Sequence, residues 1–124
     1  MAAPNLIGAV LIYGKTTGTV LSNTSPLLVL NNAASSNKVF KINTLNVANA
    51  NASTAANVTI NYYTAAILGG NALPIVANVT IPAGSTLSII DKSSQYYMEE
   101  NTSIGAIASA SNVFVVTVSY EDIS

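Results

Sequence analysis

Near its end the chain reads FVVTVSY, from Phe114 to Tyr120. Large apolar side chains occupy every second position, so they fall on one face of an extended segment, and the positions between them fall on the other. Valine, phenylalanine, tyrosine and threonine are also the residue types enriched in strands. The stretch therefore predicts a β-strand, and its unbroken apolar face predicts a central place in the core.

The same two-residue period recurs along most of the chain, as at Val58, Ile60 and Tyr62. Clusters of Gly, Asn and Pro separate the apolar runs, which is typical of turns between strands. Strands at this spacing predict an all-β fold, a single antiparallel β-sandwich or jelly-roll-like domain. We expect strands near 6–13, 18–21, 26–30, 38–48, 57–64, 73–81, 85–90, 103–109 and 113–121.

One predicted strand, 38–48, changes phase in its middle. Phe40 and Ile42 lie at even positions, whereas Leu45 and Val47 lie at odd positions. A β-bulge near Asn43 and Thr44 would return all four side chains to one inward face, because a bulge inserts one extra residue. The alternative is that both faces of this strand are partly covered.

Composition narrows the classes of function. The chain has 124 residues, of which 7% are charged, and Asn, Ser and Thr together make up one third of it. It contains no His, Cys or Trp, which excludes a thiol nucleophile, a histidine base and disulfides. Four lysines without arginine neutralise few phosphates, so we expect no nucleic-acid partner. We also expect no enzyme activity, cofactor or metal.

The acidic residues give little sign of catalysis. Glu99 and Glu100 are adjacent, as are Glu121 and Asp122, and adjacent side chains on an extended chain point apart. We expect these carboxylates to solvate strand ends and a turn. A calcium site built from Asp91, Glu99 or Glu100 would lack the Asp-x-Asp spacing typical of such loops.

Tyrosine doublets are the more informative polar feature. In Tyr62-Tyr63 and in Tyr96-Tyr97 one ring of each pair is expected in the core and the other outside. An outward tyrosine suits an interface or the stacking of a sugar, and the alternative is that the ring covers a neighbouring strand. The candidate interface residues are Pro4, Asn5, Tyr63, Tyr96 and Tyr97.

The first residues differ from the rest. Residues 1–5 lack a period and contain Pro4, which predicts an extended arm, followed by the sandwich domain at 6–124. The first positive charge is Lys15, so the start does not have the pattern of a signal peptide. The apolar runs are much shorter than the roughly 20 residues of a membrane helix, so we expect no membrane partner.

Three segments in the second half resemble a known family: IPAGSTL at 81–87, YMEENTSI at 97–104, and the stretch 113–123 that ends VSYEDI. They are similar to small β-sandwich virion proteins of tailed bacteriophages, notably those of marine and cyanobacterial phages. The chain departs from the family pattern at Asn101-Thr102, where Gly-Asp is common. Asparagine still suits a left-handed turn position, so the turn is retained.

The resemblance implies a non-enzymatic virion structural protein. The expected role is a capsid decoration (cement) protein that stabilises the head by bridging capsomers, made in the host cytoplasm and located on the capsid surface. Its expected partners are itself, as a homotrimer, and the major capsid protein of the same phage. The alternative is a tail, neck or fibre component that binds a host surface glycan. A wall hydrolase is disfavoured by the missing catalytic residues.

Overall fold

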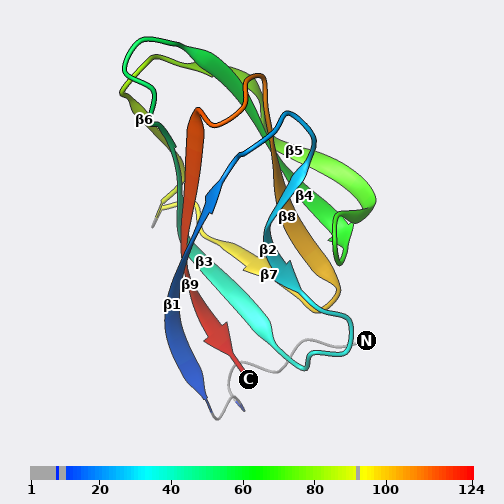
Figure 1. Ribbon diagram of the computed structural model, residues 1–124. Helices are drawn as coiled ribbons and strands as arrows, with labels where there is room; N and C mark the ends of the chain where they lie inside the picture. Colours follow the sequence, from blue (N-terminus) through cyan, green and yellow to red (C-terminus); the bar gives the residue numbers. More distant parts are fainter. Residues whose placement is uncertain (1–7, 9–10, 92) are drawn as a thin grey trace.

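The computed structural model describes residues 8, 11–91 and 93–124, and this part of the chain folds into strands joined by turns (Figure 1). The candidate residues Pro4 and Asn5 and the expected arm at 1–5 lie outside the described residues. The strands are β1 (Ile12–Val20), β2 (Leu27–Asn32), β3 (Val39–Asn49), β4 (Ala56–Ala65), β5 (Gly69–Ile81), β6 (Thr86–Ile90), β7 (Tyr96–Met98), β8 (Thr102–Ala108) and β9 (Phe114–Ile123).

Two antiparallel sheets form the layers of a sandwich. The five-stranded sheet has the order β1-β9-β3-β6, with β7 also paired to β3, and the four-stranded sheet has the order β2-β8-β4-β5. The first strands therefore alternate between sheets, and β9 returns to lie between β1 and β3. This is the strand order of a jelly roll with one short additional strand, β7. The predicted all-β sandwich is confirmed.

The core lies between the inward faces of the two sheets. Phe114, Val116 and Val118 are fully buried on β9, which pairs with β1 on one side and β3 on the other. Ile60 and Ile104 belong to the same core cluster from the opposite sheet. The predicted central position of the C-terminal strand is confirmed.

The predicted bulge in β3 is present. The pairing with β9 shifts between Ile42 and Thr44: Ile42 lies opposite Tyr120 and Thr44 opposite Ser119, which leaves Asn43 without a partner in the register. Because of this extra residue, Ile42, Leu45 and Val47 all point into the core and are fully buried.

At the start of the chain the strand prediction is wrong. We expected strands at 6–13 and 18–21 with a turn between them, whereas β1 runs unbroken through Gly14 and Gly18. Every residue of β1 has a partner on β9, so this continuous ladder holds both glycines in extended backbone. Residues 6, 7, 9 and 10 of the first predicted strand lie outside the described residues.

Smaller differences concern turns and one missed strand. Asn31 and Asn32 were expected in a turn but pair with β8, and residues 69–71 were expected in a turn but begin β5. The short strand β7 was not predicted, because three residues are too few to show a period. The remaining strands begin and end within a few residues of their predicted bounds.

Candidate functional site

A groove lined by tyrosines lies between the edges of the two sheets. Its volume is about 240 Å³. The side chains that line it come from β4, β5 and β7, which are well separated in sequence, and they are Tyr62, Leu73, Pro74, Ile75, Tyr96 and Tyr97. The groove therefore exists only because the sandwich brings these three strands together.

Strand pairing positions each wall. β5 is the edge strand of the four-stranded sheet, and its Leu73 lies opposite Tyr62 of β4. Pro74 has no N–H to donate, so an edge strand is where it is tolerated. On the other wall β7 pairs with β3, where Tyr97 lies opposite Lys41. Half-buried Tyr62 and Ile75 pack against the core, so the floor of the groove is fixed to the rigid interior.

The groove is lined by apolar side chains and by three tyrosines, which carry hydroxyl groups. Leu73 is 50% exposed and Tyr97 is 49% exposed, so both walls can be reached by another molecule. Tyrosine rings offer a large rigid face and a polar end. Such a surface can stack against a sugar ring or bury an apolar side chain of a partner protein.

Tyr96 and Tyr97 both line the groove and remain candidate interface residues. The prediction that one ring of this doublet lies in the core is wrong, because both rings are exposed and the next residue, Met98, is fully buried instead. The doublet sits at the start of a three-residue strand, so only Met98 is carried into the interior.

Tyr63 is on the outer face of its sheet, as its position in the strand predicts, but it is only 6% exposed. The expectation that it is accessible to a partner is therefore wrong. A Cβ added at Gly105 would lie 3.0 Å from the Tyr63 ring and 2.5 Å from Leu68, so the ring and Leu68 lie over this glycine. Tyr63 covers a neighbouring strand, which was the alternative interpretation.

The loop between β4 and β5 completes this cover. The backbone N–H groups of Ala66, Ile67 and Leu68 donate to Asn101 Oδ1, Asn31 Oδ1 and Ser103 Oγ at 3.0, 2.8 and 2.9 Å. These bonds hold Ile67 and Leu68 in left-handed backbone, at φ 55° and 56°, a conformation that is costly for such side chains. The outer face of β8 is thereby closed by the chain itself.

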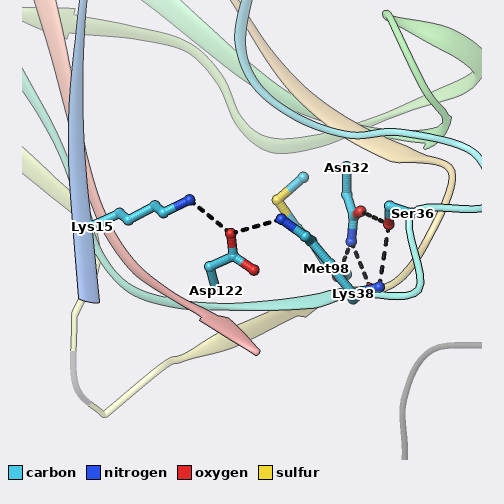
Figure 2. Close-up of polar contacts among 6 residues, drawn as sticks. All are labelled: Lys15, Asn32, Ser36, Lys38, Met98 and Asp122. Atoms are coloured by element: carbon cyan, nitrogen blue, oxygen red, sulfur yellow. Dashed lines mark hydrogen bonds and ion pairs between the residues drawn. The ribbon is translucent and has the colours of Figure 1, made fainter. Parts of the chain in front are cut away.

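A second polar site lies near the end of β9, where a buried carboxylate meets two lysines (Figure 2). Asp122 Oδ2 accepts hydrogen bonds from Lys15 Nζ at 2.8 Å and from Lys38 Nζ at 3.3 Å. Asp122 is 2% exposed, whereas more than two fifths of each lysine side chain is exposed. The expectation that Asp122 solvates a strand end is wrong, because it ties β9 to β1 and to Lys38, the residue before β3.

The charges at this site shift its proton equilibria. Burial by itself raises the pKa of Asp122, but the hydrogen bonds and positive charges of Lys15 and Lys38 outweigh it and hold the pKa below its ordinary value. The hydrogen bond to Asp122 and its negative charge raise the pKa of Lys15. Asp122 therefore stays ionised near neutral pH and acts as an ionic tie.

Neighbouring polar groups close the same end of the sandwich. Buried Asn32 donates through Nδ2 to the carbonyl oxygens of Lys38 and Met98, each at 3.0 Å (Figure 2). Glu100, also expected to be solvated, is 3% exposed and accepts the backbone N–H of Asn37 at 2.9 Å. These side chains satisfy backbone groups in turns, which is a structural role.

In residues 8, 11–91 and 93–124, no three acidic side chains gather in a way that could hold a metal ion. Within the same residues no helix has the length and hydrophobicity to cross a bilayer.

Several site residues were missed in the sequence. Asp122 continues the even-numbered face of β9, in phase with the buried Phe114. This alternation was a signal of burial that our expectation for Asp122 did not use. Leu73 and Ile75 were placed in a strand, but no sequence signal connects them with Tyr96. That connection requires that β5 pairs with β4 in one sheet and that β7 pairs with β3 in the other.

Comparison with known proteins adds one structural likeness. The sequence matches no family model and no curated protein. One similar solved structure is described as "Bacillus endospore appendages form a novel family of disulfide-linked pili". The two chains share 10% sequence identity, the match covers 99% of this chain and 94% of the other, and the TM-score is 0.49.

Proposed function

We propose that the protein is a non-enzymatic structural protein of a phage virion, and that it decorates the capsid by bridging neighbouring capsomers. The proposal rests on the location of the large apolar side chains that are exposed. Leu11, Ile12 and Tyr13 are exposed at one lateral edge of the sandwich, and Leu73 and Tyr97 at the other. Exposed apolar groups gathered at sheet edges are typical of surfaces that bind other proteins.

The three segments similar to phage virion proteins support the same role. They form the turn into β6, the turn between β7 and β8, and strand β9. Asn101 takes a left-handed conformation at φ 59°, so the residue that replaces the family's glycine preserves the turn. The shared segments therefore specify the fold, while the exposed edges supply the contacts with the major capsid protein and with further copies of the chain.

Location on the particle tests this proposal. Antibodies against the purified protein should label the heads of intact phage particles, and its copy number per particle should be comparable with that of the capsomers. Particles that lack the protein should lose their DNA at a lower temperature, and adding the purified protein should restore the wild-type value. Label confined to the tail, neck or fibres would reject the decoration role.

The groove favours one alternative function, a tail, neck or fibre component that binds a host glycan. Three tyrosines line one groove of about 240 Å³, the scale of one or two sugar rings. In that case Tyr97→Ala should abolish binding on a glycan array, whereas Tyr13→Ala, which removes an exposed tyrosine at the other edge, should leave it intact. Absence of any glycan signal for the wild-type protein would exclude this alternative.

A further inference from the structure

Strand β1 carries an open edge along its whole length. Among residues 8, 11–91 and 93–124 it is the outermost strand of its sheet, and its one partner there is β9 (Figure 1). Leu11 and Ser124 exchange two backbone hydrogen bonds, and Leu21 N–H donates to the carbonyl of Phe114. In an antiparallel ladder such pairs alternate, so the odd-numbered residues of β1 bond to β9 and the even-numbered ones direct their N–H and C=O groups outward.

The outward-directed residues are Ile12, Gly14, Thr16, Gly18 and Val20. Among the residues that the structure describes, no other segment donates to or accepts from their backbone groups. Nothing in the described part of the chain lies within 4 Å of a Cβ built on Gly14 or Gly18, so no other segment covers the outer face of the sheet at these two positions. Ile12 is 60% exposed, and Val20 is also exposed. Such an edge is a template for one more strand.

The sequence of β1 is self-complementary about Thr16. It reads IYGKTTGTV, and reversal about this centre places Gly14 opposite Gly18 and Ile12 opposite Val20. All five outward-directed residues then meet outward-directed residues of a second copy. A two-fold axis at Thr16 would therefore satisfy both edges at once, as an isologous contact requires.

Charge disfavours the neighbouring register that is centred on Lys15. A shift to a centre at Lys15 would place the two Lys15 side chains opposite one another, which is unfavourable. With the centre at Thr16, Lys15 lies opposite Thr17 of the second copy. Lysine on an edge strand normally blocks pairing, but Lys15 is turned inward, where its Nζ lies 2.8 Å from Asp122 Oδ2.

We propose that two copies of this chain pair through β1, antiparallel and centred on Thr16, so that their five-stranded sheets join into one continuous sheet. This contact deepens the self-association part of the proposed function, because it names the surface and the symmetry. It is independent of where on the particle the protein is found. It gives assemblies with an even number of copies, in contrast to the lone trimer that the phage resemblance implies.

A cysteine at the centre of the contact tests the proposal directly. The chain has no cysteine, so Thr16→Cys introduces a single thiol. Opposed residues of an antiparallel pair have Cα atoms about 4.5 to 5.5 Å apart, within the span of a disulfide. Under mild oxidation this variant should form a covalent dimer on a non-reducing gel.

Thr117→Cys is the matched control. Thr117 is exposed on β9 directly opposite Gly18, so its thiol is as accessible but lies one strand away from the edge. Across the proposed axis the two copies of β9 are separated by about three strand spacings, or about 14 Å, too far for a disulfide. Equal cross-linking of both variants, or none at Thr16→Cys, would overturn the proposal.

A second pair of variants measures the contact without cross-linking. Thr16→Lys places two like charges opposite each other at the axis and should raise the dimer dissociation constant about tenfold or more. Thr117→Lys should leave it unchanged. Sedimentation of the wild-type protein should give twice the 12.7 kDa chain mass. A wild-type monomer, or an oligomer that Thr16→Lys does not weaken, would reject β1 pairing without bearing on particle location.

Discussion

Lys15 and Asp122 are separated by 107 positions in the sequence, yet Lys15 Nζ lies 2.8 Å from Asp122 Oδ2. This ion pair joins the first strand, β1, to the last strand, β9, which are neighbours in one sheet. Lys38 Nζ reaches the same oxygen at 3.3 Å, so one buried carboxylate ties β9 to β1 and to the residue that precedes β3. The same bond turns the only charged side chain of β1 away from its open edge.

Acid should weaken the fold through Asp122. Its pKa is lower in the folded chain than in the unfolded chain, where it is about 3.9. The stabilisation is therefore fully present above the unfolded pKa and is lost as the pH falls through the folded pKa. Urea unfolding at pH 7 and at pH 3 should show a smaller free energy of unfolding at pH 3.

Asp122→Asn should reduce this difference between pH 7 and pH 3. Its two lysine partners can extend into solvent, so the variant should fold with lower stability at pH 7. Glu99→Gln removes one exposed carboxyl and serves as the control, which should keep the wild-type pH dependence. An unchanged pH dependence in Asp122→Asn would show that the ionic tie does not govern acid unfolding.

Val116→Asp should abolish folding or lower the free energy of unfolding by several kcal/mol. Val116 is fully buried on the central strand and belongs to a core cluster of hydrophobic side chains, where a carboxylate would be buried among apolar neighbours. The matched control is Val115→Asp, on the opposite face of the same strand, where the side chain is half-buried. Thermal unfolding followed by circular dichroism should separate the two. A melting curve of Val116→Asp like that of wild type would contradict the assigned core.

Gly105→Ala should destabilise the protein by about 1–3 kcal/mol, because overpacking forces neighbours to move. The added Cβ would lie 2.5 Å from Leu68 Cδ2 and 3.1 Å from the carbonyl oxygen of Leu27. The double variant with Leu68→Ala should recover part of this loss. Gly18→Ala, where a Cβ meets nothing within 4 Å, should change stability by less than about 0.5 kcal/mol.

Asn101 should tolerate glycine better than alanine. Its φ of 59° costs an alanine about 1–2 kcal/mol, and both substitutions lose the hydrogen bond from Ala66 N–H to Asn101 Oδ1. Denaturant unfolding should therefore rank wild type above Asn101→Gly and Asn101→Gly above Asn101→Ala. The reverse order of the two variants would argue against the left-handed turn.

Attachment to the particle, if the decoration role holds, should resist salt. The chain carries four lysines and a net charge of −1, so long-range electrostatic attraction is weak. Contacts built on apolar burial and backbone hydrogen bonds should survive about 1 M salt, where exposed ion pairs are screened, and should fail in mild urea. Sedimentation of treated particles measures the bound fraction. Release by salt alone would show that charged contacts with the particle dominate.

The sequence by itself determined the strands with a clear two-residue period. The apolar face of β9 follows from the alternation of Phe114, Val116 and Val118, and the phase change in β3 located the bulge at Asn43. In both cases the signal is local, because side-chain direction in a strand depends only on position along it. The same signal, followed two residues past Tyr120, also indicates an inward position for Asp122, although we expected this carboxylate to solvate a strand end.

Only the tertiary structure decided what covers each face and what meets at each edge. Tyr63 points outward as its position predicts, but the loop after β4 folds back over it. The groove joins Leu73 to Tyr97 across two sheets, and β1 runs through two glycines because β9 pairs with every one of its residues. These outcomes depend on contacts between distant segments, which local periodicity does not contain.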